Sequence, residues 1–300
     1  MSTVELVPLS ESAGKGEVTG GQRAKSVMPW GTVLQGDCLG VCESLAAKAI
    51  DLIYMDPPFF TKREQTGNKD KQGEGAAFSD RWREGLPAYL AWLRPRVEVM
   101  RRLLKGDGVF LLHLDWHAVH YAKVMCDEIF EDGGGGGFQN ELIWYYQTGG
   151  ASKGRFSRKH DTILFYSVGR EFYFDGKAVA IPRGAGAMKR AKCPTGARIK
   201  VTDTHKNPDD VLVVPALNPM ARERNGYPTQ KPAALLEMLI KALCPPGGSV
   251  GDFCCGSGTT LEAAEKLGRR WVGADANPAA VKLARERLEA IGREGRRQQT

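Results

Sequence analysis

Residues 249–260 read SVGDFCCGSGTT, an apolar stretch that runs into a glycine-containing turn. The pattern predicts a strand over Ser249–Phe253, a turn at Gly256-Ser257-Gly258 and a helix over Thr259–Leu267. Glycine allows a tight turn and lets the backbone approach a ligand closely. A strand, glycine turn and helix in this order are typical of an α/β fold, in which ligands bind at the carboxyl ends of parallel strands.

The next predicted strand, Trp271–Asp275, ends in a carboxylate. An acid at the tip of this second strand is placed to hold the ribose hydroxyls of an adenosine-type cofactor. The third glycine of the dinucleotide fingerprint is missing, because Leu261 stands at its position, and the chain has no G-K-[S/T] element. A nicotinamide enzyme is therefore disfavoured, and a P-loop nucleotide hydrolase is disfavoured further.

A second stretch, residues 51–59, reads DLIYMDPPF. The predicted strand Asp51–Met55 stops at an acid, two prolines and an aromatic. Proline lacks the N–H that a strand ladder needs, and it holds the preceding residue extended. Residues 56–59 therefore make a stiff corner that can aim a carboxylate, a bare carbonyl and an aromatic face at one small ligand. The simpler alternative is a strand-ending turn with a solvated Asp56.

Strands and helices alternate over the rest of the chain, as in a parallel sheet with crossover helices. Asp37 can cap the first helix, which we expect to reach Lys48. Pro95 is expected to kink or break the second helix. The other predicted strands are Thr32–Gly36, Val109–Leu114, Glu141–Tyr146 and Thr162–Ser167, and the other predicted helices are Leu86–Leu104, Ala118–Phe130, Lys231–Leu243 and Pro278–Ala290.

Several segments are polar and lack periodicity. Residues 1–29 are expected to form a flexible arm, and 293–300 a basic tail. Residues 61–80 are expected to form a mobile loop, and 133–137 a glycine loop. Residues 174–224 are predicted to be an irregular insertion rich in lysine and arginine. A DNA-facing role for the loop and the insertion stands beside the simpler interpretation of solvated basic surface.

The bulk composition suits one large cytoplasmic α/β domain with an insertion. The net charge of +7 weakly favours a polyanionic partner. The 7 cysteines include no C-x-x-C pair, which indicates reduced thiols rather than a disulfide framework. No stretch is long and apolar enough to span a bilayer, so no membrane partner is expected.

Four motifs make the chain resemble the beta-class DNA amino-methyltransferases. They are LQGDCL at Leu34–Leu39, DPPF at Asp56–Phe59, YPTQKP at Tyr227–Pro232 and DFCCGSGTT at Asp252–Thr260. The catalytic motif precedes the cofactor motif, as in that class and unlike most methyltransferases. The resemblance implies a three-layer, Rossmann-like S-adenosylmethionine-dependent fold with a mostly parallel sheet and a circularly permuted motif order.

The resemblance also implies a division of the chain into functional segments. Residues 30–173 would form the catalytic half, 174–224 the inserted target-recognition region, and 225–292 the cofactor-binding half. The partner would be double-stranded DNA with its target base flipped out of the stack. A homodimer and a separate restriction enzyme chain are both compatible with the family.

In this family the cofactor is S-adenosylmethionine, and the motifs carry its binding residues onto this chain. Asp275 would hold the ribose and Asp37 the adenosine end, with a plain helix cap as the alternative role of Asp37. Phe253 stands where proline is usual, and Cys254 where phenylalanine is usual, which alters the packing of the motif rather than its turn. The remaining implied cofactor residues are Thr229, Gln230, Lys231, Asp252, Gly256, Ser257, Gly258, Thr259 and Asn277.

The implied catalytic residues are Asp56, Pro57, Pro58 and Phe59. Asp56 and the Pro57 carbonyl would accept the N–H groups of an exocyclic amine, and Phe59 would stack on the flipped base. Serine more often replaces the acid in the cytosine-N4 enzymes, so Asp56 favours N6 of adenine. Methylation of cytosine N4 is the first alternative, and an RNA methyltransferase or a non-catalytic DNA-binding protein follow.

Two other groups of residues invite a functional interpretation. His113, His117 and His120 superficially resemble a zinc face, but no chemistry here requires a metal and none is expected. Cys254 and Cys255 are expected to be packing residues rather than nucleophiles. The cluster Trp144-Tyr145-Tyr146 is expected in the core, with a ring that helps to hold the flipped base as the alternative.

Overall fold

The computed structural model describes residues 27–66, 77–131, 135–147, 151–184, 204–218, 220–221 and 223–297. Its centre is a twisted sheet in which β7 runs antiparallel to both of its neighbours and the other pairings are parallel. The order of strands is β1 (Thr32–Gln35), β12 (Arg270–Asp275), β11 (Ser249–Asp252), β2 (Ile50–Met55), β5 (Leu104–Leu114), β7 (His160–Gly169), β6 (Gly135–Tyr145) and β10 (Val211–Val213).

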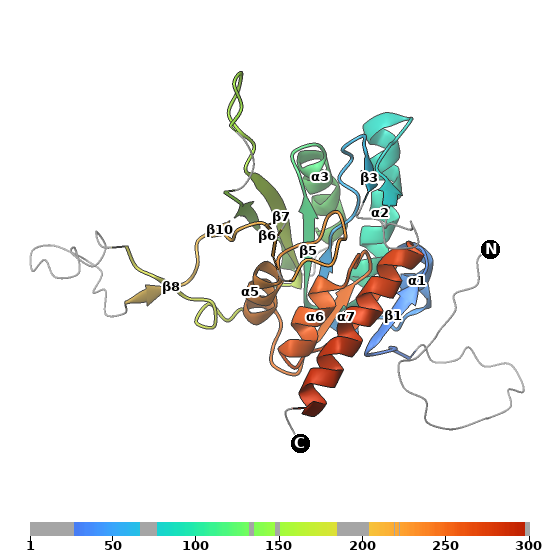
Figure 1. Cartoon of the computed structure of the whole chain (residues 1–300), viewed down its shortest axis with the longest axis vertical. Helices are drawn as coiled ribbons and strands as arrows, with labels where there is room; N and C mark the ends of the chain where they lie inside the picture. Colours follow the sequence, from blue (N-terminus) through green and yellow to red (C-terminus); the bar gives the residue numbers. More distant parts are fainter. Residues whose placement is uncertain are drawn as a thin grey trace, which may run out of the picture.

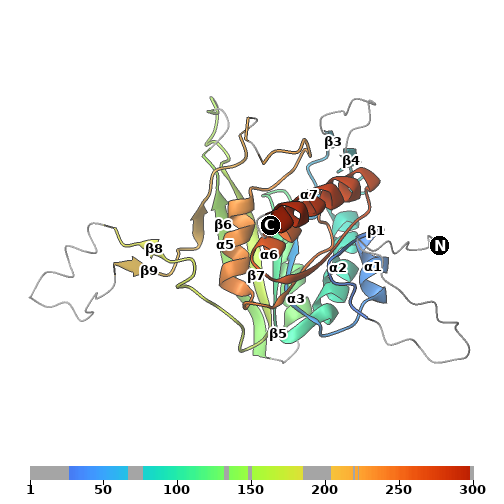
Figure 2. The same cartoon turned by 60° about the horizontal axis from the view of Figure 1, so that its bottom comes forward.

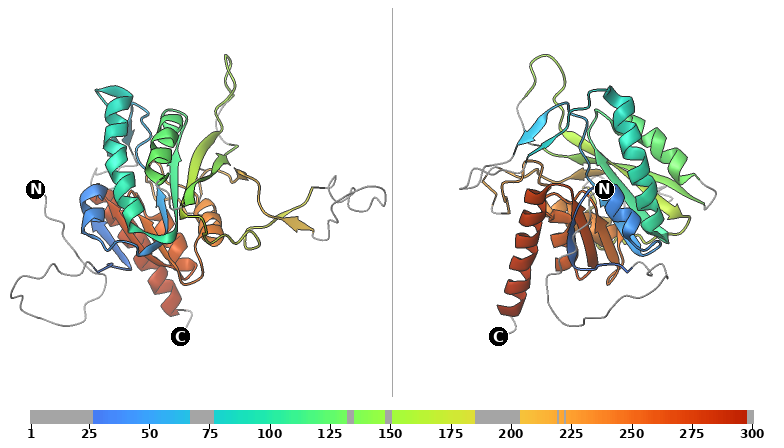
Figure 3. Two further views of the ribbon diagram at one scale, coloured as in Figure 1. Left: turned by 180° about the vertical axis from the view of Figure 1, so that it is seen from behind. Right: turned by 90° about the vertical axis from the view of Figure 1, so that its right-hand side faces the viewer.

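Helices cover both faces of this sheet and give three layers (Figures 1 and 2). Each layer of helices packs on its own hydrophobic cluster. One face carries α1 (Cys38–Ser44), α2 (Gly85–Leu103) and α3 (Val119–Phe130), and the other carries α5 (Ala233–Leu243), α6 (Thr259–Lys266) and α7 (Pro278–Arg297). The back and side views in Figure 3 show the same separation of the two helical layers. The expected three-layer α/β fold with a mostly parallel sheet is therefore confirmed.

Strand β2 shows why the sheet is buried on both faces. All six of its residues are buried, and a strand covered on both sides reads as a continuous apolar run. Successive side chains alternate between faces: Ile53 packs towards α1–α3, whereas Leu52 and Tyr54 pack in the cluster that contains α5–α7. The same alternation turns Asp56, directly after the strand, towards the α5 side.

Several predicted boundaries were wrong. Helix α1 ends at Ser44 rather than Lys48, and α7 extends to Arg297 instead of ending at Ala290. Helix α2, Gly85–Leu103, lies within one residue of its predicted bounds, and Pro95 lies inside it without breaking it. Strand β5 begins at Leu104, because its first residues pair with β2. The glycine run was predicted as a loop, yet β6 begins at Gly135 and pairs with β7, whose hydrogen bonds outweigh the weak strand propensity of glycine.

The two polar segments contain strands that the sequence did not predict. Within the expected loop 61–80, β3 (Glu64–Thr66) pairs antiparallel with β4 (Ala77–Ser79). Within the insertion, β8 (Ile181–Pro182) pairs with β9 (His205–Lys206), and β10 adds to the edge of the main sheet beside β6. Figure 1 shows β8 at the side of the molecule, away from the helical layers. The remainder of the insertion, 185–203, and most of the arm, 1–26, lie outside the described residues.

No described helix combines the length and the apolar character that crossing a membrane requires.

Candidate active site

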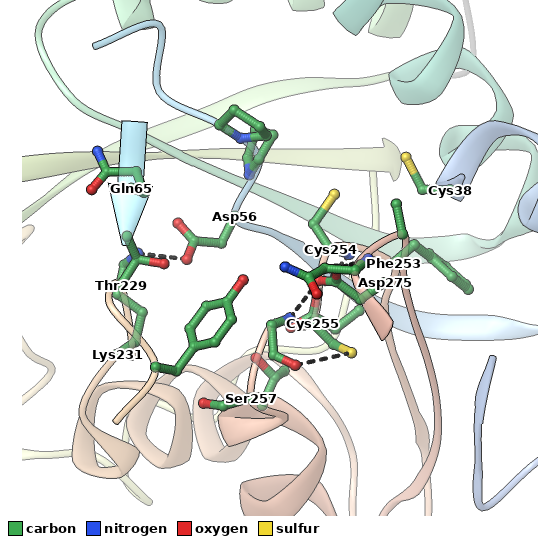
Figure 4. Close-up of a pocket in the computed structure, with 18 of the residues that line it drawn as sticks. Cys38, Asp56, Gln65, Thr229, Lys231, Phe253, Cys254, Cys255, Ser257 and Asp275 are labelled. Atoms are coloured by element: carbon green, nitrogen blue, oxygen red, sulfur yellow. Dashed lines mark hydrogen bonds and ion pairs between the residues drawn. The ribbon is translucent and has the colours of Figure 1, made fainter. Parts of the chain in front are cut away.

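The carboxyl ends of β2, β11 and β12 open onto one pocket, with a cavity volume of about 230 Å³. The DPPF corner and the glycine turn, about two hundred residues apart in the chain, face each other across it (Figure 4). The predicted site residues that line it are Asp37, Asp56, Pro57, Pro58, Phe59, Thr229, Gln230, Lys231, Asp252, Phe253, Cys254, Gly256, Ser257, Thr259, Asp275 and Asn277. Gly258 is the one predicted residue that lies behind this wall, in the turn itself.

Asp56 is held by a lysine from the other end of the chain. Its Oδ2 lies 2.5 Å from the Nζ of Lys231, and the two side chains are 16% and 10% exposed. The other carboxylate oxygen, Oδ1, is buried and has no hydrogen-bond partner among the described residues. A buried acceptor without a partner is costly, so Oδ1 is a ready position for a ligand N–H.

Phe59 is fixed between two groups. Its ring centroid lies 5.6 Å from that of His113, and the Nζ of Lys231 lies 4.9 Å from the centroid. The carbonyl of Pro58 accepts a hydrogen bond of 2.8 Å from the hydroxyl of Tyr89 on α2. The DPPF corner is therefore braced by side chains from three other elements, which limits its movement when a ligand arrives.

Asp80 closes the loop that follows the corner. Its carboxylate accepts hydrogen bonds from the backbone N–H of Phe60 at 2.8 Å and of Thr61 at 2.7 Å. Phe60 has a φ of +62°, in the left-handed region, so these bonds hold a backbone conformation that a bulky residue rarely adopts. The sequence analysis missed Asp80, because nothing local links an acid to a turn twenty residues earlier.

The glycine turn is held by Asp275. Its Oδ2 accepts from the backbone N–H of Gly256 at 2.8 Å, and its Oδ1 accepts from the backbone N–H of Asn277 at 2.8 Å. Gly256 and Gly258 have φ values of +50° and +77°, and a Cβ on Gly258 would lie 2.9 Å from the Cβ of Ala284 on α7. A Cβ on Gly256 would lie 2.8 Å from the ring of Tyr227, so both glycines are required by conformation and by close packing.

The same end of the site is rich in carboxylates. Burial raises the pKa of Asp252 to about 7 and also raises the pKa of Asp275. Asp252 accepts from the backbone N–H of Cys254 at 3.2 Å. Buried carboxylates beside backbone N–H groups suit a cofactor that carries ribose hydroxyls and positive charge, so these residues fit S-adenosylmethionine.

The contacts of Asp37 are compatible with both of its predicted roles, as a helix cap and as a residue of the cofactor site. Its Oδ1 accepts from the backbone N–H of Leu39 at 2.8 Å, as a helix cap does, and its Oδ2 lies 2.7 Å from Arg96. The residue also lines the pocket.

Gln230 of the YPTQKP element forms hydrogen bonds with the chain that precedes it. The amide oxygen of Gln230 accepts from the backbone N–H of Asn225 at 3.0 Å, and its nitrogen donates to the carbonyl of Glu223 at 2.7 Å. Gln230 therefore braces the segment before α5 in addition to lining the pocket.

Neither cysteine of the motif is placed as an activated thiolate. The hydrogen bond with Cys38, followed by burial, raises the pKa of Cys254, and burial raises the pKa of Cys255. A raised thiol pKa opposes nucleophilic reactivity, which agrees with the expected packing role.

Next to Phe59 lies a buried row of three polar side chains, Tyr54, His113 and Asp161, which the sequence analysis did not predict. The hydroxyl of Tyr54 is 2.6 Å from Nδ1 of His113, and Nε2 of His113 is 3.5 Å from Asp161. Burial raises the pKa of Tyr54 well above its usual value, so the phenol stays protonated in this row.

The supposed zinc face does not assemble. His113 faces Tyr54, whereas His117 bonds to Asp115, with Nδ1 2.7 Å from Oδ2. Across the described ranges, no three metal-binding side chains come together. Trp144 is buried and donates to the carbonyl of Val214 at 2.8 Å, which confirms its place in the core. The same prediction was wrong for Tyr145, whose side chain alternates to the other face of the edge strand β6 and is exposed.

Comparison with known proteins agrees with this geometry. Residues 50–286 match the N6_N4_Mtase family, described as DNA methylase. A relative in Escherichia coli (strain K12), DNA adenine methyltransferase YhdJ, is 26% identical over 260 residues, which are 86% of this chain and 82% of that protein.

Solved structures share the fold. The cytosine-N4-specific PvuII DNA methyltransferase superposes with a TM-score of 0.60 at 20% identity and 85% coverage of each chain. M1.HpyAVI in complex with S-adenosylmethionine gives a TM-score of 0.54 at 18% identity, with 85% of this chain and 98% of that chain covered. The cofactor is S-adenosylmethionine. The chain belongs to the DNA methylase family, whose members methylate N6 of adenine or N4 of cytosine.

Proposed function

We propose that this protein methylates N6 of adenine in duplex DNA, with Asp56 as the residue that receives the target amine. The observation that carries the proposal is the free carboxylate oxygen of Asp56, Oδ1, which is buried at the pocket without a partner among the described residues. An exocyclic amine supplies the N–H group that this oxygen lacks.

The amine of adenine is a weak nucleophile, because its lone pair is delocalised into the ring. Asp56 Oδ1 accepts one N–H, and the carbonyl of Pro57 accepts the other. These two bonds favour a tetrahedral nitrogen whose lone pair points out of the base plane. Positioning and electrostatics supply most of the gain.

Lys231 and Phe59 complete the arrangement. Lys231 holds Oδ2 of Asp56 at 2.5 Å, which fixes the carboxylate so that Oδ1 remains directed at the ligand. Phe59 offers a ring for stacking on a base that has left the duplex, since the amine is out of reach inside the stack.

Bound S-adenosylmethionine supplies a methyl group on a positively charged sulfur, and the electron pair of that carbon–sulfur bond stays with the sulfur. The target nitrogen forms the new bond to carbon and loses one proton, which the carboxylate of Asp56 is placed to accept before passing it to water.

Adenine is preferred over cytosine for two reasons. An acid stands at position 56, where cytosine-N4 enzymes more often carry serine, and the Escherichia coli relative is an adenine methyltransferase. Cytosine N4 is the second candidate, supported by the shared fold of the PvuII enzyme.

Nucleoside analysis tests the proposal. The protein is incubated with S-adenosylmethionine and mixed-sequence duplex DNA, or with RNA as the control polymer, and the digested nucleosides are identified by mass spectrometry. We expect N6-methyladenine in DNA alone. N4-methylcytosine would overturn the assignment of the base, and methylation of RNA alone would overturn the assignment of the polymer.

A further inference from the structure

The loop between β6 and β7 leaves the sheet at the edge where the active site lies. Met55, directly before Asp56, is in register with Leu112 of β5, and Leu114 of β5 pairs with Thr162 of β7. The β6–β7 loop, residues 151–159 here, therefore rises from the carboxyl edge of the parallel strands. Figure 1 shows it projecting beyond the rest of the molecule, above the labels of β6 and β7.

This loop is basic and has no acid. Residues 151–159 read ASKGRFSRK and carry the cations Lys153, Arg155, Arg158 and Lys159. The side chains of Lys153, Arg155 and Arg158 are exposed. Among the described residues, neither Lys153 nor Arg155 forms an ion pair, so both charges are available to a polyanion.

The loop also carries an aromatic side chain that is almost fully exposed. Phe156 is 99% exposed, more than any other large hydrophobic residue described. Burying a phenylalanine side chain is favourable, and the free protein leaves this one in solvent. Apolar side chains that insert between base steps, or stack on bases, become buried in this way in protein–DNA complexes.

The base of the loop is braced rather than loose. The guanidinium carbon of Arg158 lies 3.6 Å from the ring centroid of Trp116, and that ring stacks on His117 at 3.7 Å. Near the tip, the backbone N–H of Ser152 donates to the hydroxyl of Ser157 at 2.9 Å. A preorganised arm loses less entropy when it binds.

We propose that the β6–β7 loop is a DNA-contacting arm. In this proposal Lys153 and Arg155 bind phosphates, and Phe156 inserts into the duplex where the target base has left the stack. The inference rests on the proposed function, since it places the arm beside the base that Asp56 receives. Alternating cations with one exposed aromatic fit nucleic acid better than a protein surface, which would cover the phenylalanine with apolar side chains.

Salt dependence tests the phosphate contacts. Binding of a labelled mixed-sequence duplex is measured by fluorescence anisotropy between 50 and 200 mM salt for wild type, Lys153→Ala and Arg155→Ala. Each substitution should lower the magnitude of the log–log salt slope by about one, because one counterion fewer is released. The matched control is Lys48→Ala, an exposed lysine just before β2 at the opposite edge of the sheet, which should keep the wild-type slope. Wild-type slopes in both loop variants would overturn these contacts.

A substrate with an unpaired target base tests Phe156. Once sequencing of wild-type product has located a methylated site, kcat/KM is measured on the matched duplex and on one with an abasic position opposite the target. Phe156→Ala should lose about tenfold or more on the matched duplex. It should recover to near wild-type activity on the second duplex, because the base there is already unpaired.

A control variant and the remaining outcomes distinguish failure of the arm from failure of the proposed function. Tyr121→Ala, an exposed aromatic on α3, is the control and should match wild type on both duplexes. Insertion would be overturned if Phe156→Ala lost the same factor in kcat/KM on both duplexes, or lost none. It would also be overturned if the substitution changed only the self-association of the protein, as measured by sedimentation. Failure of wild type to produce any methylated site in the preceding sequencing step would instead contradict the proposed function.

Discussion

The cofactor side and the target side of the pocket are built in different ways. Around the glycine turn, short buried strands lead towards helices, and Asp275 accepts the backbone N–H of Gly256 in the turn and that of Asn277 after its own strand. Around the DPPF corner, the support comes from distant elements: Tyr89 of α2, His113 of β5 and Lys231 before α5. The cofactor side is thus held by contacts within residues 252–277, whereas the target side depends on residues as far as 175 positions away in the chain.

The largest expected effect is a loss of cofactor affinity. Asp275→Ala removes the acceptor of the Gly256 and Asn277 backbone N–H groups, and with it the acid that the sequence analysis assigned to the ribose. We expect cofactor affinity to fall about a hundredfold, since two hydrogen bonds to a charged group are worth about 1.5–3 kcal/mol each before losses overlap. Calorimetric titration with S-adenosylmethionine measures this. Affinity within threefold of wild type would show that the turn does not depend on Asp275.

A substitution behind the pocket wall tests the packing of the same turn. Gly258→Val adds a Cβ 2.9 Å from the Cβ of Ala284 at a φ of +77°. We expect a loss of about 3 kcal/mol in the free energy of unfolding, from overpacking plus backbone strain. Urea denaturation measures the loss. Gly268→Val is the control, because Gly268 also has a positive φ but nothing lies within 4 Å of its Cβ position.

The target side responds differently to the loss of its lysine. Lys231→Met removes the partner of Asp56 Oδ2 while keeping the length of the side chain. We expect the single-turnover rate to fall roughly tenfold, because the carboxylate is no longer held in one orientation. Cofactor affinity should change less than threefold. A loss of affinity equal to the loss of rate would assign Lys231 to the cofactor side.

The smallest expected effect is a pH dependence of the affinity for the cofactor. Burial raises the pKa of Asp252 from 3.8 to about 7, so this group is largely protonated at pH 6 and ionised at pH 8 in the free protein. The ionised form attracts a cationic cofactor, so affinity should rise by at most about tenfold from pH 6 to pH 8. Titrations in Asp252→Asn should be flat over this range, and a wild-type affinity that falls with pH would reverse the assigned sign.

The difference between the sides also explains what the sequence could predict. The order of strands and helices around the glycine turn follows from local periodicity, and so does the placing of Asp275 and the DPPF corner at one edge of the sheet. The ion pair between Asp56 and Lys231 joins residues 175 positions apart, and no local pattern encodes it.

The elements that escaped prediction are short or edge strands in polar surroundings. Strand β10 has three residues, and β3 pairs with β4 across a segment that is polar and charged. Such strands depend on the partner strand that they find, so intrinsic propensity does not indicate them. The polar chain of Tyr54, His113 and Asp161 likewise exists only because β2, β5 and β7 are neighbours.

The most direct test of the account uses one variant and two readouts. For Asp56→Ala and wild type, the cofactor dissociation constant and the single-turnover rate on methylatable duplex DNA are measured on the same preparations. We expect the rate to fall by about a hundredfold to a thousandfold, as for the loss of one preorganised hydrogen-bonding group, and the dissociation constant to stay within about threefold. Parallel losses of rate and affinity, or a rate that survives, would contradict the role of Asp56 as the acceptor of the target amine.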